Sequence, residues 1–241
     1  LGAASAGTSE DIGLSSNFKY GTGTTNNTIA SYRTAARILT DPMASRANII
    51  VIPGIRDSFL TDYVLDRSLQ YGQAIYIMDI PHYDGDNNRL FDDSSGRPAV
   101  DKTSENLDSR ALDNNYGATY FPDVSIRDNS TGVIIQVPSS IAALGAIGFN
   151  DSISYPWFAP AGFNRGALDS IVNVDVKLSA GDRNTLYESR INPIATFPNA
   201  GFVIFGQKTL QQAHTAIDRV NVRRMLLEVK RLVSDVANKI V

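Results

Sequence analysis

The sequence predicts an α/β fold in which most strands of the central sheet are parallel. Residues 47–55 and 74–81 are largely continuous apolar runs, a pattern typical of strands that are buried on both faces. The segment between them carries apolar residues at helical spacing. A strand, a helix and a second strand in this order form a right-handed unit whose two strands are parallel.

Residue signals mark both ends of the helix between these two strands. Asp57 can cap the helix N-terminus with its side chain, and Gly72 can end the helix in a left-handed conformation. Apolar residues recur between them at the spacing of one helix face: Leu60, Val64, Leu65 and Leu69. We therefore expect a helix from about residue 58 to residue 71.

The middle of the chain predicts an exposed loop followed by several shorter elements. Residues 82–104 are polar and have neither helical nor strand periodicity, so we expect an exposed loop. A short helix is expected over residues 105–114 and a strand over 117–123. Residues 124–138 predict a hairpin because turn residues separate two alternating segments. Pro138 then suits the first turn of a helix rich in small residues.

The sequence changes character after residue 151, where aromatic residues, Pro and Gly follow one another without a period. This change predicts a domain junction. Beyond it we expect strands over residues 171–178 and 201–206, a helix over 179–190, and a long C-terminal helix that begins near residue 216 or 218.

The composition excludes several classes of protein. The 241 residues contain no cysteine, which excludes disulfides, thiolate metal sites and a cysteine nucleophile from this sequence. The formal charge is −3, with 43% hydrophobic and 20% charged residues, as in a soluble globular protein. The first 13 residues lack the basic and apolar regions of a targeting peptide, and no window has the ~20 apolar residues of a membrane-spanning helix. We expect neither membrane insertion nor binding to nucleic acid.

Only two histidines are available for acid–base chemistry or metal binding. His82 follows a predicted strand, and we favour a place in a surface loop over a catalytic role, because no nucleophile motif accompanies it. His214 lies in a polar run, and a place in a surface loop is favoured over a catalytic role still more strongly there. The alternative is a hydrolase of α/β architecture that uses Asp79 or Asp123 with His82, since active sites of such sheets gather at strand ends.

The polar loop also resembles the start of a calcium-binding loop, with Asp84, Asp86 and Asn88 at alternating positions. An EF-hand needs Gly at the sixth position and an acidic residue at the twelfth. Arg89 and Ser95 occupy these positions here, so we favour a solvated loop without a metal ion. The sequence predicts no catalytic residue, metal ion or cofactor.

The C-terminal helix is strongly amphipathic and locally basic. Residues 218–241 hold six basic and three acidic side chains, whereas the preceding part has a net charge of −6. Since each residue of an α-helix turns by 100° about the helix axis, the apolar residues fall within one arc of about 120°. They are Val222, Met225, Leu226, Val229, Leu232, Val233, Val236 and Ile240. We favour packing of this arc against the core over binding of a partner.

Several short groups of residues follow one another along the second half of the chain: Tyr120 with Pro122, Pro138 with Ser139, Ala159-Pro160-Ala161-Gly162, Asn192-Pro193, Gly206-Lys208-Thr209 and Asn221-Val222-Arg223-Arg224. In this order and spacing, the sequence resembles the contractile tail sheath proteins of long-tailed bacteriophages. The resemblance is good over residues 116–241, weaker over 47–81 and uninformative before that.

The resemblance implies a structural protein that is not an enzyme. Such subunits polymerise helically around a tail tube and contract to drive the tube through the host envelope. It implies a subtilisin-like α/β domain at residues 47–157 with the loop 82–104, and a smaller α+β C-terminal domain at 158–241 that faces the tube. Residues 1–46 would be a linker with a first helix.

The resemblance also implies partners and contact residues. We expect contacts with neighbouring sheath subunits, the tail tube protein, the baseplate and the tail terminator, in a virion tail assembled in the host cytoplasm. The candidates for tube or neighbour contact are basic residues of the last helix: Arg219, Arg223, Arg224, Lys230 and Arg231. Charge reversal at Arg223 and Arg224 is expected to weaken assembly and to leave thermal stability nearly unchanged.

Sheath proteins of this kind continue beyond the last helix into an arm that adds a strand to a neighbouring subunit. The chain ends at Val241 within the helical pattern and begins without Met, so we expect a truncated core that is monomeric in solution. The sheath of a related system, a tailocin or a type VI secretion apparatus, is an alternative that the sequence does not separate from a phage tail.

Overall fold

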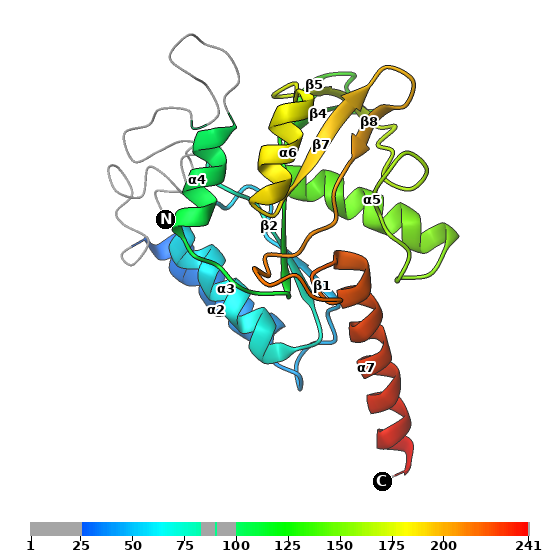
Figure 1. Cartoon of the computed structure of the whole chain (residues 1–241). Coiled ribbons are helices and arrows are strands. Elements are labelled where there is room, and N and C mark those ends of the chain that lie inside the picture. Colours follow the sequence, from blue (N-terminus) through cyan, green and yellow to red (C-terminus); the bar gives the residue numbers. More distant parts are fainter. Residues whose placement is uncertain (1–25, 83–89, 91–99, 241) are drawn as a thin grey trace.

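The computed structural model describes residues 26–82, residue 90 and residues 100–240. A five-stranded sheet forms its centre, in the order β1-β2-β3-β7-β8 (Figure 1). The four strands β1, β2, β3 and β7 are parallel, and β8 is antiparallel to β7. The strands are β1 (Ile49–Val51), β2 (Ile75–Met78), β3 (Gly117–Phe121), β7 (Ile191–Phe197) and β8 (Gly201–Ile204).

Helices cover both faces of this sheet, so the protein has three layers with two hydrophobic cores. One core holds buried residues of the helices α2, α3, α4 and α6, and the other holds buried residues of α5 and α7. Successive residues of β2 alternate between the two cores, as expected for a strand covered on both sides. The helices are α2 (Asn27–Leu39), α3 (Ser58–Tyr71), α4 (Asp101–Ser109), α5 (Ser139–Ile153), α6 (Ala180–Glu188) and α7 (Val220–Ile240).

A smaller antiparallel sheet follows the carboxyl end of β3, in the order β5-β4-β6. Its strands are β4 (Val124–Arg127), β5 (Ile134–Val137) and β6 (Ile171–Val174). β4 and β5 form the predicted hairpin, with Gly132 at φ 72° in the connecting turn. The inner residues Val124, Val137 and Val174 extend the core beneath α5.

Many predicted elements are confirmed. The first strand, helix and second strand form the expected parallel unit, and α3 has Asp57 as its N-cap and Gly72 at φ 65° as its C-cap. The mixed α/β class with a mostly parallel sheet is therefore confirmed, whereas a subtilisin-like topology stays a prediction. The long last helix also forms, although it begins at Val220, after the predicted start.

Other elements differ from the prediction. α4 begins at Asp101, four residues earlier than expected, and ends at Ser109. β7 was not predicted, because Asn192 and Pro193 are unfavourable strand residues and Pro193 has no backbone N–H. Pro193 is accommodated in part because its carbonyl accepts the N–H of Phe205 at 2.8 Å.

Asp84, Asp86 and Asn88, whose spacing resembles the start of a calcium-binding loop, lie outside the described residues, as does most of the loop predicted at 82–104. β7 belongs to the predicted C-terminal segment, yet it pairs with β3 of the preceding segment, so both contribute to one sheet. None of the described helices is both long and apolar enough to cross a membrane.

Candidate functional site

Four buried polar residues gather at the carboxyl ends of the parallel strands. Arg56 follows β1, Asp79 and His82 follow β2, and Asp123 follows β3. Their exposed fractions are 5% or less. Because the carboxyl ends of parallel strands meet at one edge of a sheet, residues far apart in the sequence come together here.

Asp123 is the centre of the first half of this network. Its carboxylate lies 2.7 Å from Arg56 Nη2 and 3.5 Å from His82 Nε2, and it accepts the backbone N–H of Ser139 at 3.0 Å. Burial alone would raise the pKa of Asp123, but hydrogen bonding and charge from His82, together with Arg56, hold it below its ordinary value. Asp123 is therefore ionised and bound to the first turn of α5.

Asp79 is the centre of the second half. It accepts hydrogen bonds from the backbone N–H of Gly54 at 2.9 Å and from Ser140, through the backbone N–H at 3.1 Å and the hydroxyl at 2.7 Å. Burial raises the pKa of Asp79 above its ordinary value, against the opposing effects of Arg56 and these hydrogen bonds. Both carboxylates thus use the free N–H groups at the N-terminus of α5.

His82 is buried next to Asp123, so the prediction that it lies in a surface loop is wrong. Periodicity indicated that the strand had ended, but it could not show that His82, which follows the strand, is buried. The Ser139 hydroxyl donates to the carbonyl of Tyr120 at 2.8 Å. The network joins the ends of three strands to α5, which is a structural arrangement.

The described residues offer no metal centre, since no three or more of their His, Asp and Glu side chains form a group that could hold a metal ion. His214 is exposed, and its Nδ1 lies 3.4 Å from the carboxylate of Asp218. The exposed position of His214 agrees with the surface location that its polar run favours.

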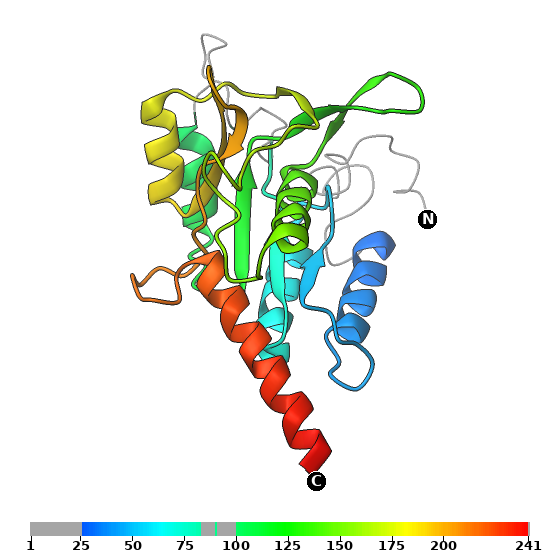
Figure 2. The same ribbon diagram turned by 90° about the vertical axis from the view of Figure 1, so that its right-hand side faces the viewer.

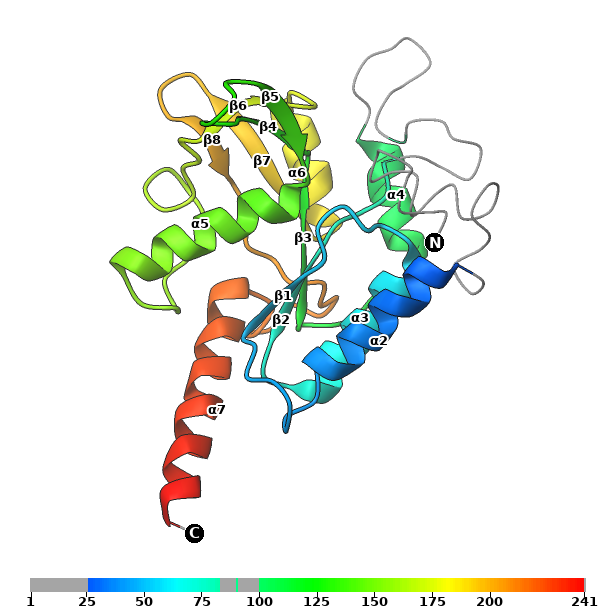
Figure 3. The same ribbon diagram turned by 180° about the vertical axis from the view of Figure 1, so that it is seen from behind.

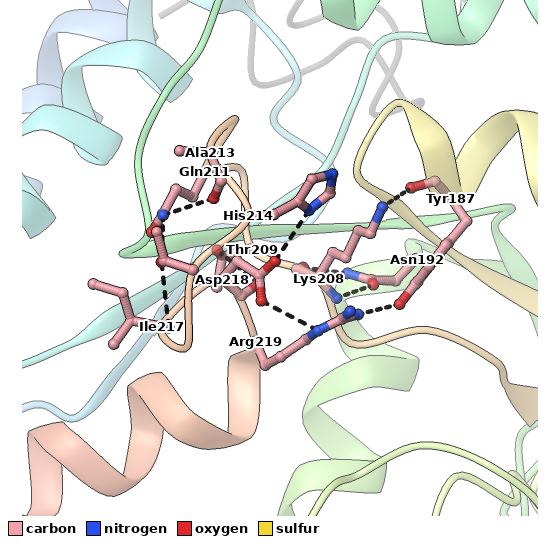
Figure 4. Close-up of polar contacts among 11 residues, drawn as sticks. Tyr187, Asn192, Lys208, Thr209, Gln211, Ala213, His214, Ile217, Asp218 and Arg219 are labelled. Carbon is pink, nitrogen blue, oxygen red and sulfur yellow. Dashed lines mark hydrogen bonds and ion pairs between the residues drawn. The ribbon is translucent and has the colours of Figure 1, made fainter.

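A second polar cluster joins β7 to the segment that leads into α7 (Figure 4). The side chain of Asn192 accepts the backbone N–H of Lys208 at 2.6 Å and donates to the carbonyls of Lys208 and Thr119 at 2.8 and 2.9 Å. Lys208 in turn donates from Nζ to the carbonyl of Tyr187 at 2.9 Å. The groups Asn192-Pro193 and Lys208-Thr209, which carry part of the family resemblance, therefore meet in space.

Arg219, the first candidate contact residue, belongs to this cluster. Its guanidinium donates to the hydroxyl of Tyr187, and its Nε lies 3.2 Å from Asp218 (Figure 4). Asp218 is itself fixed, because its carbonyl accepts the backbone N–H of Thr209 at 2.8 Å. Arg219 is half-buried and helps to hold the start of α7 against α6.

Arg223 and Arg224 are buried within the chain. The Arg223 guanidinium lies 4.3 Å from the ring centre of Tyr116, and burial lowers its pKa. Arg224 forms an ion pair with Asp151 and donates to the carbonyl of Pro156 at 3.2 Å. Because 5% or less of either residue is exposed, the expectation that charge reversal at this pair leaves thermal stability unchanged does not agree with the structure.

Lys230 and Arg231 are exposed, and both also have contacts within the chain. Lys230 Nζ donates to the hydroxyl of Tyr116 at 2.9 Å. Arg231 pairs with Glu228 and lies 3.5 Å from Asp235 on the same helix. Asp235 also lies 3.8 Å from Arg46, and both residues line a groove of about 390 Å³ between α7 and the segment before β1.

The apolar arc of α7 points away from the molecule, so the prediction that it packs against the core is wrong for most of its length. The buried residues of α7 are Val220, Arg223, Arg224 and Leu227, on the opposite side of the helix. The helix projects beyond the sheet in all three views (Figures 1, 2 and 3). The exposed residues, called here the α7 face, are Val229 (48%), Leu232 (51%), Val233 (63%), Val236 (57%) and Ile240 (79%).

A second exposed apolar surface lies on α5 and was not predicted. The buried side of this helix is rich in small residues such as Ala143 and Ala146, as the sequence indicated. Its outer side carries large apolar residues that are 37–61% exposed, called here the α5 face: Ile141, Leu144, Phe149 and Ile153. Their spacing of three to five residues is visible in the sequence and could have identified the stripe.

No protein-family model matches the chain. The sequence is 35% identical over 146 residues to a tail sheath protein of Vibrio phage KVP40, which is 61% of this chain and 21% of that protein. It is 30% identical over 115 residues to the tail sheath protein of Enterobacteria phage T4, or 48% of this chain and 16% of that protein. The matched part of the chain thus corresponds to about a fifth of these relatives.

Solved structures of contractile injection systems have a similar fold. The sheath of an extracellular contractile injection system, the PVC sheath complex in its contracted state, has a TM-score of 0.62 and 20% identity, and covers 82% of this chain and 49% of that chain. The contracted helical sheath of the anti-feeding prophage has a TM-score of 0.60 and 18% identity, over 87% and 51% of the two chains.

Proposed function

We propose that this chain, a homologue of part of the tail sheath proteins of bacteriophages, belongs to a subunit of a contractile sheath. The sheath polymerises helically around a tail tube and contracts to drive the tube through the host envelope. The observation that carries this proposal is the sequence match to the tail sheath proteins of phages KVP40 and T4, at 35% and 30% identity. The fold shared with sheaths of contractile injection systems supports it.

The role proposed is structural and not enzymatic. The network around Asp123 resembles the hydrolase alternative in composition, since it pairs a histidine with a carboxylate. Its members are buried and fix the strand ends to α5, which favours a structural role. A subunit that transmits force needs such rigid internal connections while its contacts with neighbours change.

We propose neighbouring copies of the subunit and the tail tube protein as partners, with the baseplate and tail terminator at the two ends of the sheath. An anti-feeding prophage baseplate structure contains a chain of similar fold, with a TM-score of 0.57, which supports the baseplate contact. The place of action would be the virion tail. A tailocin or type VI secretion sheath remains the alternative, and the genomic neighbourhood distinguishes it through the presence or absence of capsid genes.

Within the subunit, we propose that residues 158–241 face the tube. The proposed subtilisin-like α/β domain, which the sequence placed at residues 47–157, also takes in β7 and β8, since these strands complete its sheet. Lys230 and Arg231 are the contact residues that the described surface favours, because both are exposed. Arg219 is half-buried, and Arg223 and Arg224 have partners inside the chain, so they would act by holding α7 in place.

Electron microscopy of the protein expressed from its natural gene, with and without its tube protein, tests the proposal. We expect hollow tubular polymers with helical symmetry. A protein that stays unpolymerised over a range of salt concentrations and in the presence of the tube would contradict it. Reversal of charge at Arg231, with reversal at the exposed and distant Arg127 as a matched control, tests the contact surface.

A further inference from the structure

We propose that residues 229–240, called here the distal segment of α7, unfold and refold as a separate unit while the rest of the protein stays folded. The segment is helical in the structure, as the continuation of the part of α7 that packs on the sheet. The inference concerns the free protein and does not depend on the proposed sheath function. It is carried by the burial, the contacts and the composition of this segment.

The burial of α7 stops before the distal segment begins. The last buried residue of the helix is Leu227, which belongs to the core shared with α5. From residue 229 to residue 240 every side chain is exposed except that of Asp235, which is partly buried. Among the described residues, neither hydrophobic core includes a residue of α7 after Leu227. The distal segment therefore lacks the tertiary packing that supplies most of the stability of helices in proteins.

Two polar side chains join the distal segment to other described elements. Lys230 Nζ donates to the hydroxyl of Tyr116 at 2.9 Å, where the segment begins. Asp235 lies 3.8 Å from Arg46, whose side chain is 82% exposed. An exposed ion pair of this kind is screened by water and salt and contributes little to stability. These two contacts therefore oppose local unfolding only weakly.

The composition of the distal segment does not compensate for the missing packing. β-Branched or short polar residues, which have low helix propensity, occupy most of its positions: Val229, Val233, Ser234, Asp235, Val236, Asn238 and Ile240. Arg231 pairs with Glu228 and Asp235 along the helix, and such exposed pairs add little. The free energy of local unfolding is therefore close to zero, as it is at fraying helix ends, and far below that of the core.

Local unfolding changes the surface that the protein presents. The residues of the α7 face share one arc only while the segment is helical. In the unfolded form they are spread along a solvated chain, and the apolar face is absent. Because exposed apolar patches favour association, this equilibrium limits the fraction of the free protein that carries such a patch. The distal segment thus acts as a conformational switch for the α7 face.

Hydrogen–deuterium exchange followed by mass spectrometry tests the proposal on the protein expressed from its natural gene and kept unassembled by dilution. Backbone N–H groups of residues 233–240 are expected to have protection factors of about 10 or less, against at least about 1,000 for those in the middle of α3. Protection of the distal segment equal to that of α3 would overturn the proposal, and the proposed sheath function would be unaffected.

Cleavage by trypsin is an independent measurement. Arg231 lies in the distal segment, and Arg67 is a partly exposed control on α3, which is anchored in the core. A protease cleaves a helix only after it has opened locally, so cleavage after Arg231 is expected to be at least about tenfold faster than cleavage after Arg67. Equal rates would show that both helices open together, which would contradict a separate unit.

Substitutions that change helix propensity test whether the two measurements report the same equilibrium. Ser234, Ala237 and Asn238 are exposed. The double variant Ser234→Ala with Asn238→Ala should raise the protection of the distal segment about fivefold, and Ala237→Gly should lower it about threefold. Cleavage after Arg231 should change in step.

The melting temperature of the whole protein is the control for these variants. It should stay within about 1 °C of the wild-type value, because the distal segment is already open when the rest unfolds. A melting temperature that rises and falls with the protection of the distal segment would show that the segment unfolds together with the core, and would overturn the proposal. Protection that is the same in all variants would overturn it as well.

Discussion

Arg56 and Asp123 form a buried ion pair, with Nη2 and Oδ2 2.7 Å apart and both side chains at most 6% exposed. The two residues are 67 positions apart and follow different strands, β1 and β3. Asp123 also accepts the backbone N–H of Ser139, so the pair fixes two strand ends to the first turn of α5. Removal of one partner leaves a buried charge without its main counterion, which is more costly than the loss of a surface pair.

Asp123→Asn should lower the free energy of unfolding by about 3–5 kcal/mol at pH 7. His82 and Arg56 hold the pKa of Asp123 below its ordinary value of 3.8 despite burial. The stabilisation is therefore present above that value and is lost as the pH falls through the lower pKa of the folded protein. Urea unfolding from pH 7 to pH 3 should show that the difference in unfolding free energy between wild type and variant becomes smaller in acid. A difference that stays constant over this range would contradict the ion pair.

Asp79→Asn is the matched control, with the opposite dependence on pH. Burial raises the pKa of Asp79, so its contribution is fully present below its unfolded pKa and is lost as the pH rises through the folded pKa. The stability gap between wild type and this variant should shrink from pH 3 toward pH 7. The same direction of change for both variants would show that the two carboxylates do not have the different environments described.

Arg224→Glu should destabilise the protein by about 3–5 kcal/mol, because it places a carboxylate beside Asp151 in a buried position. Arg231→Glu, about two helical turns away, should change stability by about 1 kcal/mol or less, since exposed pairs contribute little. Thermal unfolding followed by circular dichroism separates the two. Equal melting temperatures for both variants would mean that Arg224 is a free surface residue.

Gly206→Ala should cost about 1–3 kcal/mol through overpacking. A Cβ atom at this position would lie 2.9 Å from Asn192 Oδ1 and 3.0 Å from Pro193 Cδ. Gly181→Ala is the control, because its added Cβ meets nothing closer than Ser179 Oγ at 3.7 Å and Ala favours a helix. Differential scanning calorimetry should show a lower melting temperature for the first variant alone; an unchanged value would place Asn192 away from this turn.

Leu227→Ala should lower the free energy of unfolding by about 2–5 kcal/mol, because this residue is 5% exposed within the core shared with α5. Leu232→Ala removes the same atoms from a residue that is 51% exposed, and about 1 kcal/mol or less is expected. Urea unfolding of the unassembled protein measures both. A larger loss for Leu232 would mean that the apolar arc of α7 faces the core.

Local signals in the sequence located most elements, since caps and periodicity act within a few residues. Asp57 and Gly72 delimited α3, and the turn before β5 identified the hairpin. β7 was missed because its Asn192 and Pro193 oppose strand formation locally. Hydrogen bonds of the Asn192 side chain to Thr119 and Lys208, which are distant in sequence, help to fix the segment beside β3.

For the candidate site, the sequence identified the amphipathic helix, its basic residues and the family resemblance. Periodicity gives the width of an apolar arc but not the direction in which it faces, so the exposure of the α7 face was decided by tertiary structure. The same holds for Arg223 and Arg224, whose burial depends on Tyr116 and Asp151.

By itself, the sequence determined the α/β class, the ends of several helices and the absence of cysteine chemistry, because each of these depends on composition or on neighbours along the chain. The tertiary structure alone decided that His82 lies beside Asp123, that Arg224 is buried, and that α5 and α7 expose apolar faces on one side of the sheet. These features depend on which residues the packing of strands and helices brings together across long separations, and local periodicity carries no record of that packing.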